Sequence, residues 1–359
     1  MTAANEAYDE LVTDALPAHE RYLSRISKSF TLLILFAIMI VFALREGSSF
    51  FNARNFNDII IDSSQLVVLS VGMTFVIIAA GIDLSVGSIL VLSSVVAAQV
   101  TIALSGSPQD IANFQFPTQH VGIPVGLVAG VATGLLCGVV NGLLITRLQV
   151  PAFIVTLGML GIALGFGQLL SGGTSVPNVP PAIQSEIGLR ELVAFDVAGQ
   201  RVRITPPVVI AYGIAIVAAI VLNRTRFGRY TYAIGSNAAA AMRAGINVRL
   251  HLVKIYALSG LLAGVAGAMD LMRFGTASVG SHQADNLAAI SATVIGGTSL
   301  FGGIGTIGGS VVGAFIPTVL RNGLVIARVQ PFWQNVAIGA VLILAVYIDQ
   351  RRRRAEERM

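Results

Sequence analysis

The chain has 359 residues, of which 55% are hydrophobic and only 11% are charged. Soluble domains carry roughly 25% charged residues, so this composition excludes an ordinary soluble protein and indicates a polytopic membrane protein. The net charge of +5 does not indicate a nucleic-acid partner, because Lys and Arg gather at the ends of apolar segments and in the tails, where they report membrane topology. The 38 glycines are typical of transmembrane helices that approach one another closely.

We expect an all-α fold of about ten transmembrane helices over residues 30–349, between a polar tail at 1–29 and a basic tail at 350–359. The apolar segments that predict the spans are 30–45, 58–80, 86–104, 121–145, 151–171, 207–222, 252–272, 286–300, 303–326 and 332–348. For 286–300, a re-entrant hairpin with the following glycine run is the alternative to a full span. Ten crossings place most Lys and Arg residues on the side of the two tails and of the loop 223–251, so both termini are predicted to be cytoplasmic.

The chain is organised around a polar break at residues 81–88, which read GIDLSVGS between two long apolar runs. A carboxylate facing lipid costs several kcal/mol. It is tolerated where protein covers the irregular backbone or where that backbone lines a wet cavity. The break is therefore either a short turn in which Asp83 or Ser85 caps the next helix, or a broken-helix element on a solute path, and the two interpretations are compatible.

The larger of the predicted outer loops covers residues 172–206. Its proline-rich turn at 177–181 favours a rigid, structured loop, because proline restricts the backbone. Arg201 and Arg203 follow near its end, either as solvated charges at the membrane edge or as contacts for an acidic partner.

The inner loop 223–251 contains a predicted helix of about two turns. Ser236 and Asn237 are suitable N-caps, the alanine-rich stretch 238–244 favours a helix, and Gly245 stands where a glycine ends one. A helix this short is marginal alone, so a partner is expected to pack on it. The alternative is a basic loop that only maintains topology.

A glycine-rich stretch follows, with eight glycines between residues 296 and 313. It does not have the GxxxxGK[ST] arrangement of a phosphate loop, and neither does any other part of these 359 residues. Close helix packing or a tight turn explains the glycines better.

No constellation for catalysis, cofactor binding or metal binding is apparent, so we expect neither an enzyme nor a metal or cofactor site. The four histidines have no metal-ligand spacing, and neither GxSxG nor HExxH occurs. Asp62 is expected near the outer end of its span. Asp270 is expected to pair with Arg273 three residues later, in preference to serving as a proton relay. Asn141 is a polar group on a span, suited either to helix–helix contact or to solute contact.

Four motifs follow one another in a fixed order: GIDLSVGS at 81–88, VPAFIVTLGML at 150–160, YAIGSNAAAAMRAGI at 232–246, and VIGGTSLFGG at 294–303 followed by PFWQ at 331–334. Together they resemble the ribose-type ABC sugar permeases, the inner-membrane translocators of bacterial importers for ribose, galactose, xylose and related solutes. The resemblance implies a multi-pass inner-membrane protein with separate cytoplasmic ATPase subunits, a periplasmic or lipid-anchored sugar-binding protein, and a second permease subunit that is either an identical copy or a paralogue. Membrane lipid is a further expected partner, and nucleic acid is not expected.

The resemblance also implies roles for residues of this chain. The helix at 236–247 corresponds to the coupling helix that docks on the ATPase. The glutamate that importer permeases often carry there is absent from this chain. A salt bridge from that glutamate to the ATPase is therefore not expected. The residues implied in coupling are Ser236, Asn237, Ala240, Ala241, Arg243 and Gly245. Arg201 and Arg203 are candidates for docking the binding protein in the periplasmic loop 172–206.

A sugar path requires weak, exchangeable polar contacts. The candidates for it are Asp83, Ser85, Ser88, Asn141, Thr156, Thr298 and Ser299. The alternative function is an ion-coupled secondary transporter or channel for a small polar solute, which would use the break at 81–88 together with an intramembrane acid. The energy source, ATP with a partner subunit or an ion gradient alone, separates the two.

Overall fold

The computed structural model describes residues 18–330 except residue 283, together with residues 332–334, 336–337, 339–340, 343–344 and 347. Most of the predicted tail 1–29 and all of the tail 350–359 lie outside these residues, and the predicted span 332–348 is described only in part. The elements are α2 Ala18–Glu46, η1 Gly47–Ser49, α3 Ala53–Ile78, α4 Val86–Ser105, α5 Pro108–Ala112, α6 Gln119–Arg147, α7 Ala152–Ser171, η2 Ile183–Gly188, β1 Val193–Val197, β2 Gln200–Ile204, α8 Pro206–Arg224, α9 Arg226–Arg243, α10 Val248–Phe274, α11 Asp285–Ile295 and α12 Ile307–Ile326.

The predicted class, an all-α polytopic membrane protein, is confirmed. Among the described residues, eight helices are long and apolar enough to cross a membrane, namely α2, α3, α4, α6, α7, α8, α10 and α12. Each corresponds to one predicted span. Their ends follow local chemistry: Asn52 and Asn247 accept hydrogen bonds from the first turns of α3 and α10, and Gly172 and Gly275 adopt the left-handed conformation that ends α7 and α10.

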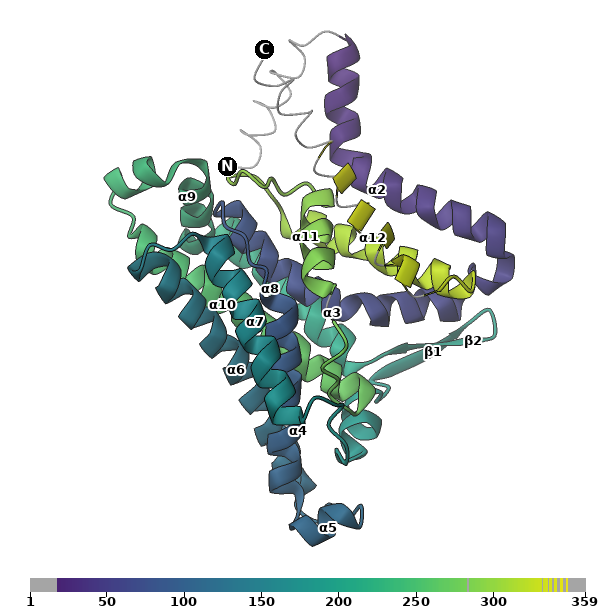
Figure 1. Ribbon diagram of the computed structural model, residues 1–359. Helices are drawn as coiled ribbons and strands as arrows, with labels where there is room; N and C mark the ends of the chain where they lie inside the picture. Colours follow the sequence, from purple (N-terminus) through teal and green to yellow (C-terminus); the bar gives the residue numbers. More distant parts are fainter. Residues whose placement is uncertain are drawn as a thin grey trace.

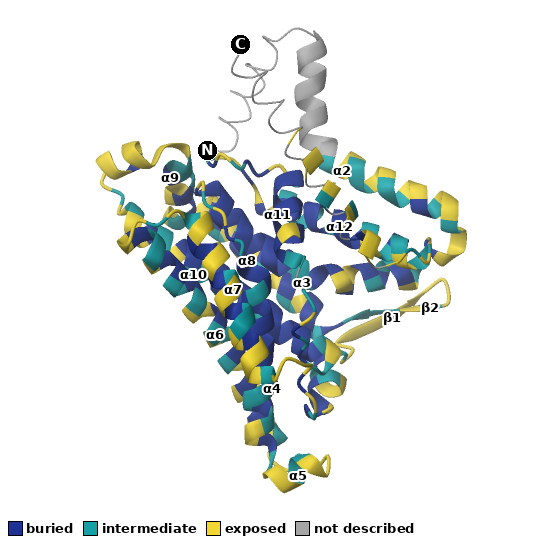
Figure 2. Ribbon diagram, in the orientation of Figure 1, coloured by how far each residue is buried: buried dark blue, intermediate teal, exposed yellow. Residues whose placement is uncertain are grey.

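The helices form one bundle with α3, α4 and α10 at its centre (Figure 1). Buried residues concentrate on these three helices, whereas the outer faces of α6, α7 and α8 are exposed and apolar (Figure 2). To one side, α2 and α12 pack beside the first half of α3 around a smaller core that contains Phe42, Phe50 and Val319. We call the two ends of the bundle the α9 end and the hairpin end, the latter after the antiparallel pair β1–β2.

A ladder of glycines on α6 allows it to pack closely against α4 and α10. The ladder residues recur every fourth position and are Gly122, Gly126, Gly130, Gly134, Gly138 and Gly142. A Cβ atom on Gly138 would lie 2.3 Å from the carbonyl oxygen of Tyr256, and one on Gly134 would lie 2.4 Å from that of Gly260. The expectation that the abundant glycines serve close helix contact is confirmed here.

The segment between α10 and α12 crosses the bundle without a full-length helix. It begins at the hairpin end, where Ala277 forms a bridge to Val176 of the loop 172–206. Among its described residues the helix is α11, whose 11 residues make about 16 Å at 1.5 Å per residue, too short to span a hydrocarbon core of about 30 Å. The segment then reaches the α9 end, where the Gly303 N–H donates to the Ile78 carbonyl oxygen, 2.8 Å apart. The predicted span 286–300 is thus a crossing that is only partly helical.

Candidate functional site

Three stretches singled out from the sequence meet at the α9 end: the break after α3, the bend within α9, and the glycine-rich turn before α12. Gly235 of α9 lies so close that a Cβ atom there would be 2.7 Å from the Gly303 nitrogen. The Gly303 N–H in turn donates to Ile78 at the end of α3, and the Tyr232 hydroxyl donates to the Gly305 carbonyl oxygen at 2.7 Å. The backbones of all three stretches are therefore in direct contact, and glycine makes this approach sterically possible.

The short helix predicted in the inner loop is present as the last part of α9. Asn237 breaks the helical backbone with φ −162° and ψ 97°, and its Oδ1 accepts a hydrogen bond from the Ala240 N–H at 2.9 Å. Gly245 ends the helix with φ +84°. The predicted cap at Asn237 and the predicted glycine stop are confirmed. The first part of α9, residues 226–236, is an additional helix that the sequence did not predict.

This terminal helix projects from the bundle. Ser236, Asn237, Ala240, Arg243 and Gly245 are all exposed. Ala241 is the exception, with 5% of its surface exposed. Met242 is 64% exposed, so the helix presents an apolar side chain as well as a cation to its surroundings. Ser236 does not cap the helix, because it lies before the bend and contacts Gly303 instead.

The break at 81–88 is the centre of a buried polar cluster formed by four helices. Asp83 is completely buried and accepts hydrogen bonds from the Ser85 N–H and hydroxyl at 2.9 and 2.6 Å, and from the Ser259 hydroxyl at 2.9 Å. Asn141 on α6 donates from Nδ2 to the Ser85 hydroxyl at 3.0 Å. Its Oδ1 has no hydrogen-bond partner among the described residues. Ser85 stands at the N-cap position of α4 but makes no side-chain cap bond, so the predicted capping role of its hydroxyl is wrong: it binds Asp83 instead.

The carbonyl group of Ile82 completes this cluster. It accepts hydrogen bonds at 3.4 Å from both the Thr156 hydroxyl of α7 and the Tyr256 hydroxyl of α10. Three predicted path residues besides Asp83 therefore share one site: Ser85, Asn141 and Thr156. Tyr256 and Ser259 were missed, although two polar residues three positions apart on the apolar α10 were a usable signal.

The remaining predicted path residues lie apart from the cluster. Ser88 is partly buried on α4. Thr298 and Ser299 are buried in the turn before α12, where the Ser299 hydroxyl accepts from the Phe301 N–H at 3.2 Å and the Thr298 hydroxyl has no partner among the described residues.

The expected pairing of Asp270 with Arg273 is wrong. Asp270 Oδ1 lies 2.8 Å from Nε2 of His282, whose Nδ1 lies 2.7 Å from Oδ2 of Asp285. Arg273 instead pairs with Asp62 of α3. Asp270 and Arg273 each pair with a residue that is distant in sequence and that only the three-dimensional fold brings near. The network joins α10, the segment between α10 and α11, and α11 itself. No group of three or more metal-ligating side chains suited to a metal ion is found in the described part of the chain.

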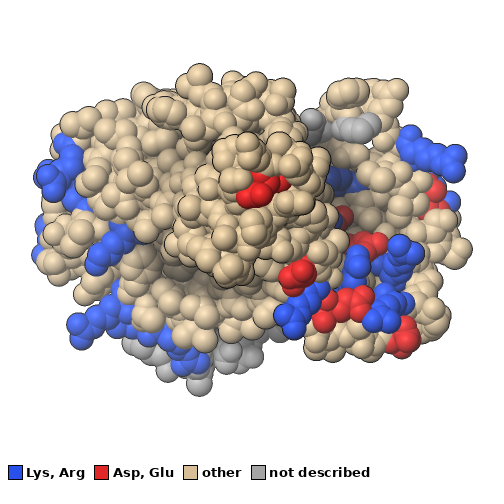
Figure 3. Space-filling view, turned by 90° about the horizontal axis from the view of Figure 1, so that it is seen from below, with Lys and Arg blue, Asp and Glu red and all other residues tan. Residues whose placement is uncertain are grey.

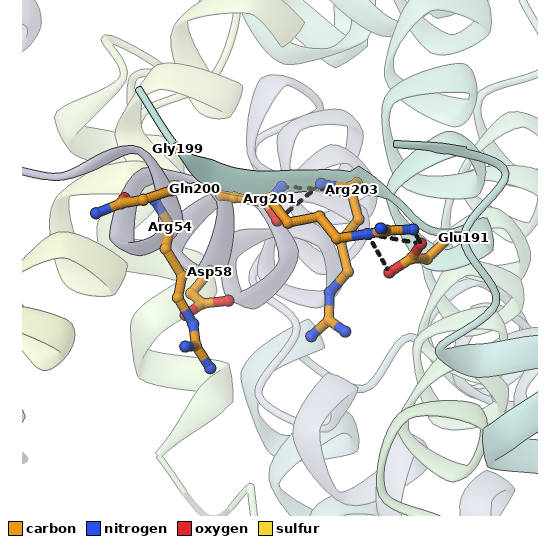
Figure 4. Close-up of a pocket in the computed structure, with 8 residues that line it drawn as sticks. Arg54, Asp58, Glu191, Gly199, Gln200, Arg201 and Arg203 are labelled. Atoms are coloured by element: carbon orange, nitrogen blue, oxygen red, sulfur yellow. Dashed lines mark hydrogen bonds and ion pairs between the residues drawn. The ribbon is translucent and has the colours of Figure 1, made fainter. Parts of the chain in front are cut away.

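The hairpin end carries a charged pocket of about 390 Å³ beside β2, formed by the hairpin and the start of α3. Arg201 turns toward Glu191, with which it pairs, whereas the side chains of Arg54 and Arg203 extend on the same side of the strand without joining that pair (Figure 4). The hydrogen bond from Arg201 holds the pKa of Glu191 below its ordinary value. The loop 172–206 is structured, as its prolines predicted, because it contains η2 and the hairpin.

Charge divides the two ends of the molecule. Seen from the hairpin side, acidic and basic side chains mix around the hairpin pocket, whereas only basic side chains appear toward the opposite edge, on the side of α9 (Figure 3). The α9 end carries Arg224, Arg226, Arg229, Arg243 and Arg249, all exposed.

Comparisons with known proteins give the family of this chain. Residues 55–346 match the family model of the permease component of branched-chain amino acid transport systems. The chain is 35% identical over 354 residues to the fructose import permease protein of Rhizobium meliloti, covering 97% of this chain and 91% of that protein. It is 33% identical over 323 residues to the ribose import permease protein of Escherichia coli, covering 89% and 93% of the two chains.

A third relative is the galactose/methyl galactoside import permease protein of Haemophilus influenzae, 35% identical over 321 residues, with 89% of this chain and 92% of that protein covered. No solved structure matches significantly. These relatives and the eight apolar helices identify a multi-pass protein of the inner membrane. The chain therefore belongs to the ribose-type sugar permease family of ABC importers.

Proposed function

We propose that this chain is the translocating subunit through which an ABC importer moves a monosaccharide or a related polyol. The permeases it resembles are named for fructose, ribose and galactose, all neutral and rich in hydroxyl groups. Two copies, or one copy and a paralogue, form the translocation path. Separate ATPase subunits supply the energy and a periplasmic or lipid-anchored binding protein delivers the sugar. The chain itself performs no catalysis.

The observation that carries this proposal is the exposed terminal helix of α9, which follows directly after Gly235, where the backbone contacts Ile78 at the end of α3 and the glycine-rich turn. A two-turn helix is unstable alone and here buries only Ala241 against its own chain, so a partner on its exposed side is expected. The basic α9 end is the cytoplasmic end under the positive-inside rule, which is where an ATPase subunit binds. A displacement of this helix is transmitted through Gly235 to Ile78 and Gly303, because the backbone of Gly235 contacts the backbones of both.

The hairpin pocket is proposed as the docking site for the binding protein. Arg203 and Arg54 line it, and neither forms an ion pair with another described residue. Both can therefore bind a carboxylate of the binding protein. Arg201 is less available for this contact, because it is already paired with Glu191. Charge reversal at Arg203 tests this role.

For the sugar path we propose the cluster around Asp83, with Ser85, Asn141 and Thr156. These groups are closed off in the present arrangement, since each is buried. The unpaired Oδ1 of Asn141 is an acceptor available to a sugar hydroxyl once the helices part. Ser88, Thr298 and Ser299 are proposed as further contacts of the same path.

The decisive experiment replaces Gly245 with Val. A β-branched side chain is strained at φ +84°, and no atom lies within 4 Å of a Cβ atom there, so the change distorts the helix end without disturbing the bundle. We expect the variant to insert normally and to bind the ATPase subunits while sugar uptake no longer follows ATP hydrolysis. Gly47→Val is the matched control, because Gly47 also has positive φ and open surroundings but lies beside α2.

Unchanged coupling in Gly245→Val would contradict the assignment of this helix. The wider proposal is tested by purifying the tagged full chain in mild detergent. Recovery of an ATPase subunit whose hydrolysis responds to a sugar-loaded binding protein supports it. A chain that purifies alone and moves solute in vesicles with only an ion gradient would establish the ion-coupled alternative.

A further inference from the structure

An apolar groove of about 500 Å³ runs along α8, where α8 and α10 both pack against α3. On α8 it extends from Val209 to Val221, Leu258 and Leu262 of α10 form the other wall, and Phe75 of α3 also lines it. Gly213 lines it as well, and a Cβ atom there would have nothing within 4 Å. The groove lies between helices that are long and apolar enough to cross a membrane, which places it within the hydrocarbon region.

The groove is slightly longer than one leaflet of a bilayer and covers the central part of α8. Twelve residues separate Val209 from Val221 along the helix, which is about 18 Å at 1.5 Å per residue. Half of a hydrocarbon core of about 30 Å is roughly 15 Å. An extended acyl chain of one leaflet therefore fits the groove along most of its length.

Two cations stand where the groove reaches the α9 end. Arg224 follows Val221 by three positions on α8, and Lys254 precedes Leu258 by four positions on α10. Residues three or four apart share a helix face, so both cations belong to the faces that line the groove. Both are exposed, and neither forms an ion pair within the part of the chain that the structure describes. Apolar walls that end at unpaired cations are complementary to a molecule with a long apolar tail and an anionic head.

We propose that this groove binds an anionic phospholipid of the leaflet at the α9 end, with an acyl chain along α8 and the phosphate between Arg224 and Lys254. A second copy of this chain is a poorer occupant. A two-fold axis along the membrane normal would bring the same cations of both copies toward each other, and like charges repel. A lipid phosphate instead neutralises them.

The test measures lipid retained by the full chain, together with any subunits that co-purify. The protein is reconstituted into nanodiscs containing equal amounts of phosphatidylglycerol and phosphatidylcholine, re-extracted, and weighed by native mass spectrometry. The wild type is expected to retain phosphatidylglycerol in preference to phosphatidylcholine. The double variant Arg224→Gln/Lys254→Gln should retain roughly 30-fold less of it, from the contribution of two basic residues near an anionic lipid.

Matched controls separate this site from general attraction to basic loops. Arg147→Gln removes an equally exposed cation at the same end of α6 and should leave retention unchanged. Gly213→Phe fills the groove and should displace the lipid, whereas Ile216→Phe adds bulk to an exposed α8 residue that does not line the groove and should not. Because Arg224 and Lys254 are exposed, the charge variant does not endanger folding.

Three outcomes would overturn the proposal. The first is equal retention of the two lipids by the wild type. The second is retention that falls equally in Arg147→Gln and in the double variant, or that survives Gly213→Phe. The third is efficient cross-linking of a Gly213→Cys variant into a covalent homodimer, in a Cys137→Ser background, which would assign the groove to a second copy.

Discussion

Replacing Gly138 with Ala tests whether the glycine ladder of α6 determines the packing of the bundle. The added Cβ atom would lie 2.3 Å from the Tyr256 carbonyl oxygen and 2.9 Å from the Gly260 Cα atom, whereas ordinary contacts begin near 3.4 Å. The two helices must therefore separate locally by about 1 Å, and a gap of that size forfeits a quarter to a half of the attraction of each contact it opens. Overpacking of this kind costs about 1–3 kcal/mol.

The matched variant is Gly158→Ala on α7, where a Cβ atom has nothing within 4 Å. Both changes gain the same helix propensity, about 0.8–1.0 kcal/mol, so this contribution cancels when the variants are compared. Thermal unfolding of the full chain in detergent should place Gly138→Ala below Gly158→Ala by about 1–3 kcal/mol, all of it from packing. Equal stability of the two variants would refute the argument that backbone contact at the ladder limits the approach of α6 to α10.

Three further predictions concern the buried and outer charges. Asp83→Ala should lower the free energy of unfolding by about 1–3 kcal/mol, because the Ser85 and Ser259 hydroxyls lose their acceptor. Asp83→Asn keeps an acceptor oxygen and should cost less. Equal losses of the two variants in thermal unfolding would contradict the hydrogen-bond explanation. His282→Asn leaves Asp270 and Asp285 without their shared partner and should cost about 3–5 kcal/mol, whereas His120→Asn on the exposed start of α6 should cost nothing measurable in the same assay. Glu191 has a lowered folded pKa, so its ion pair with Arg201 contributes stability at neutral pH and loses it as the pH falls through that pKa, below the ordinary value of 4.5. An NMR titration of the Glu191 carboxyl carbon should show this midpoint rise toward the ordinary value in Arg201→Gln, and an unmoved midpoint would exclude Arg201 as the cause.

The parts of the fold governed by local chemistry were predictable from the sequence. Hydropathy located eight spans, and the Asn237 cap and the Gly245 stop located the terminal helix of α9, because both depend on residues within one or two turns. Asp270 shows the limit. Its neighbour Arg273 was the obvious partner, but His282 reaches it from a segment whose path depends on the whole bundle.

The candidate site was predictable only in pieces. The break, the short helix and the glycine-rich turn were each recognisable, but their contact depends on Gly235 and Gly303 meeting Ile78, from which both are more than one hundred and fifty residues distant in the chain. Tyr256 and Ser259 are recognisable as polar residues on an apolar helix, but their place in the Asp83 cluster depends on α10 crossing the break, which a single sequence does not show.

The partly helical crossing between α10 and α12 also has a consequence for biogenesis. A segment whose apolar helix has 11 residues does not partition into a bilayer by itself, and its extended part leaves backbone groups that lipid cannot satisfy. Its helix α11 packs against α3, α4 and α12, and His282 contacts Asp270 of α10. The segment therefore reaches its place only after these helices offer a protein surface to receive it. Because α12 follows the segment in the chain, membrane insertion cannot proceed strictly in chain order at this point.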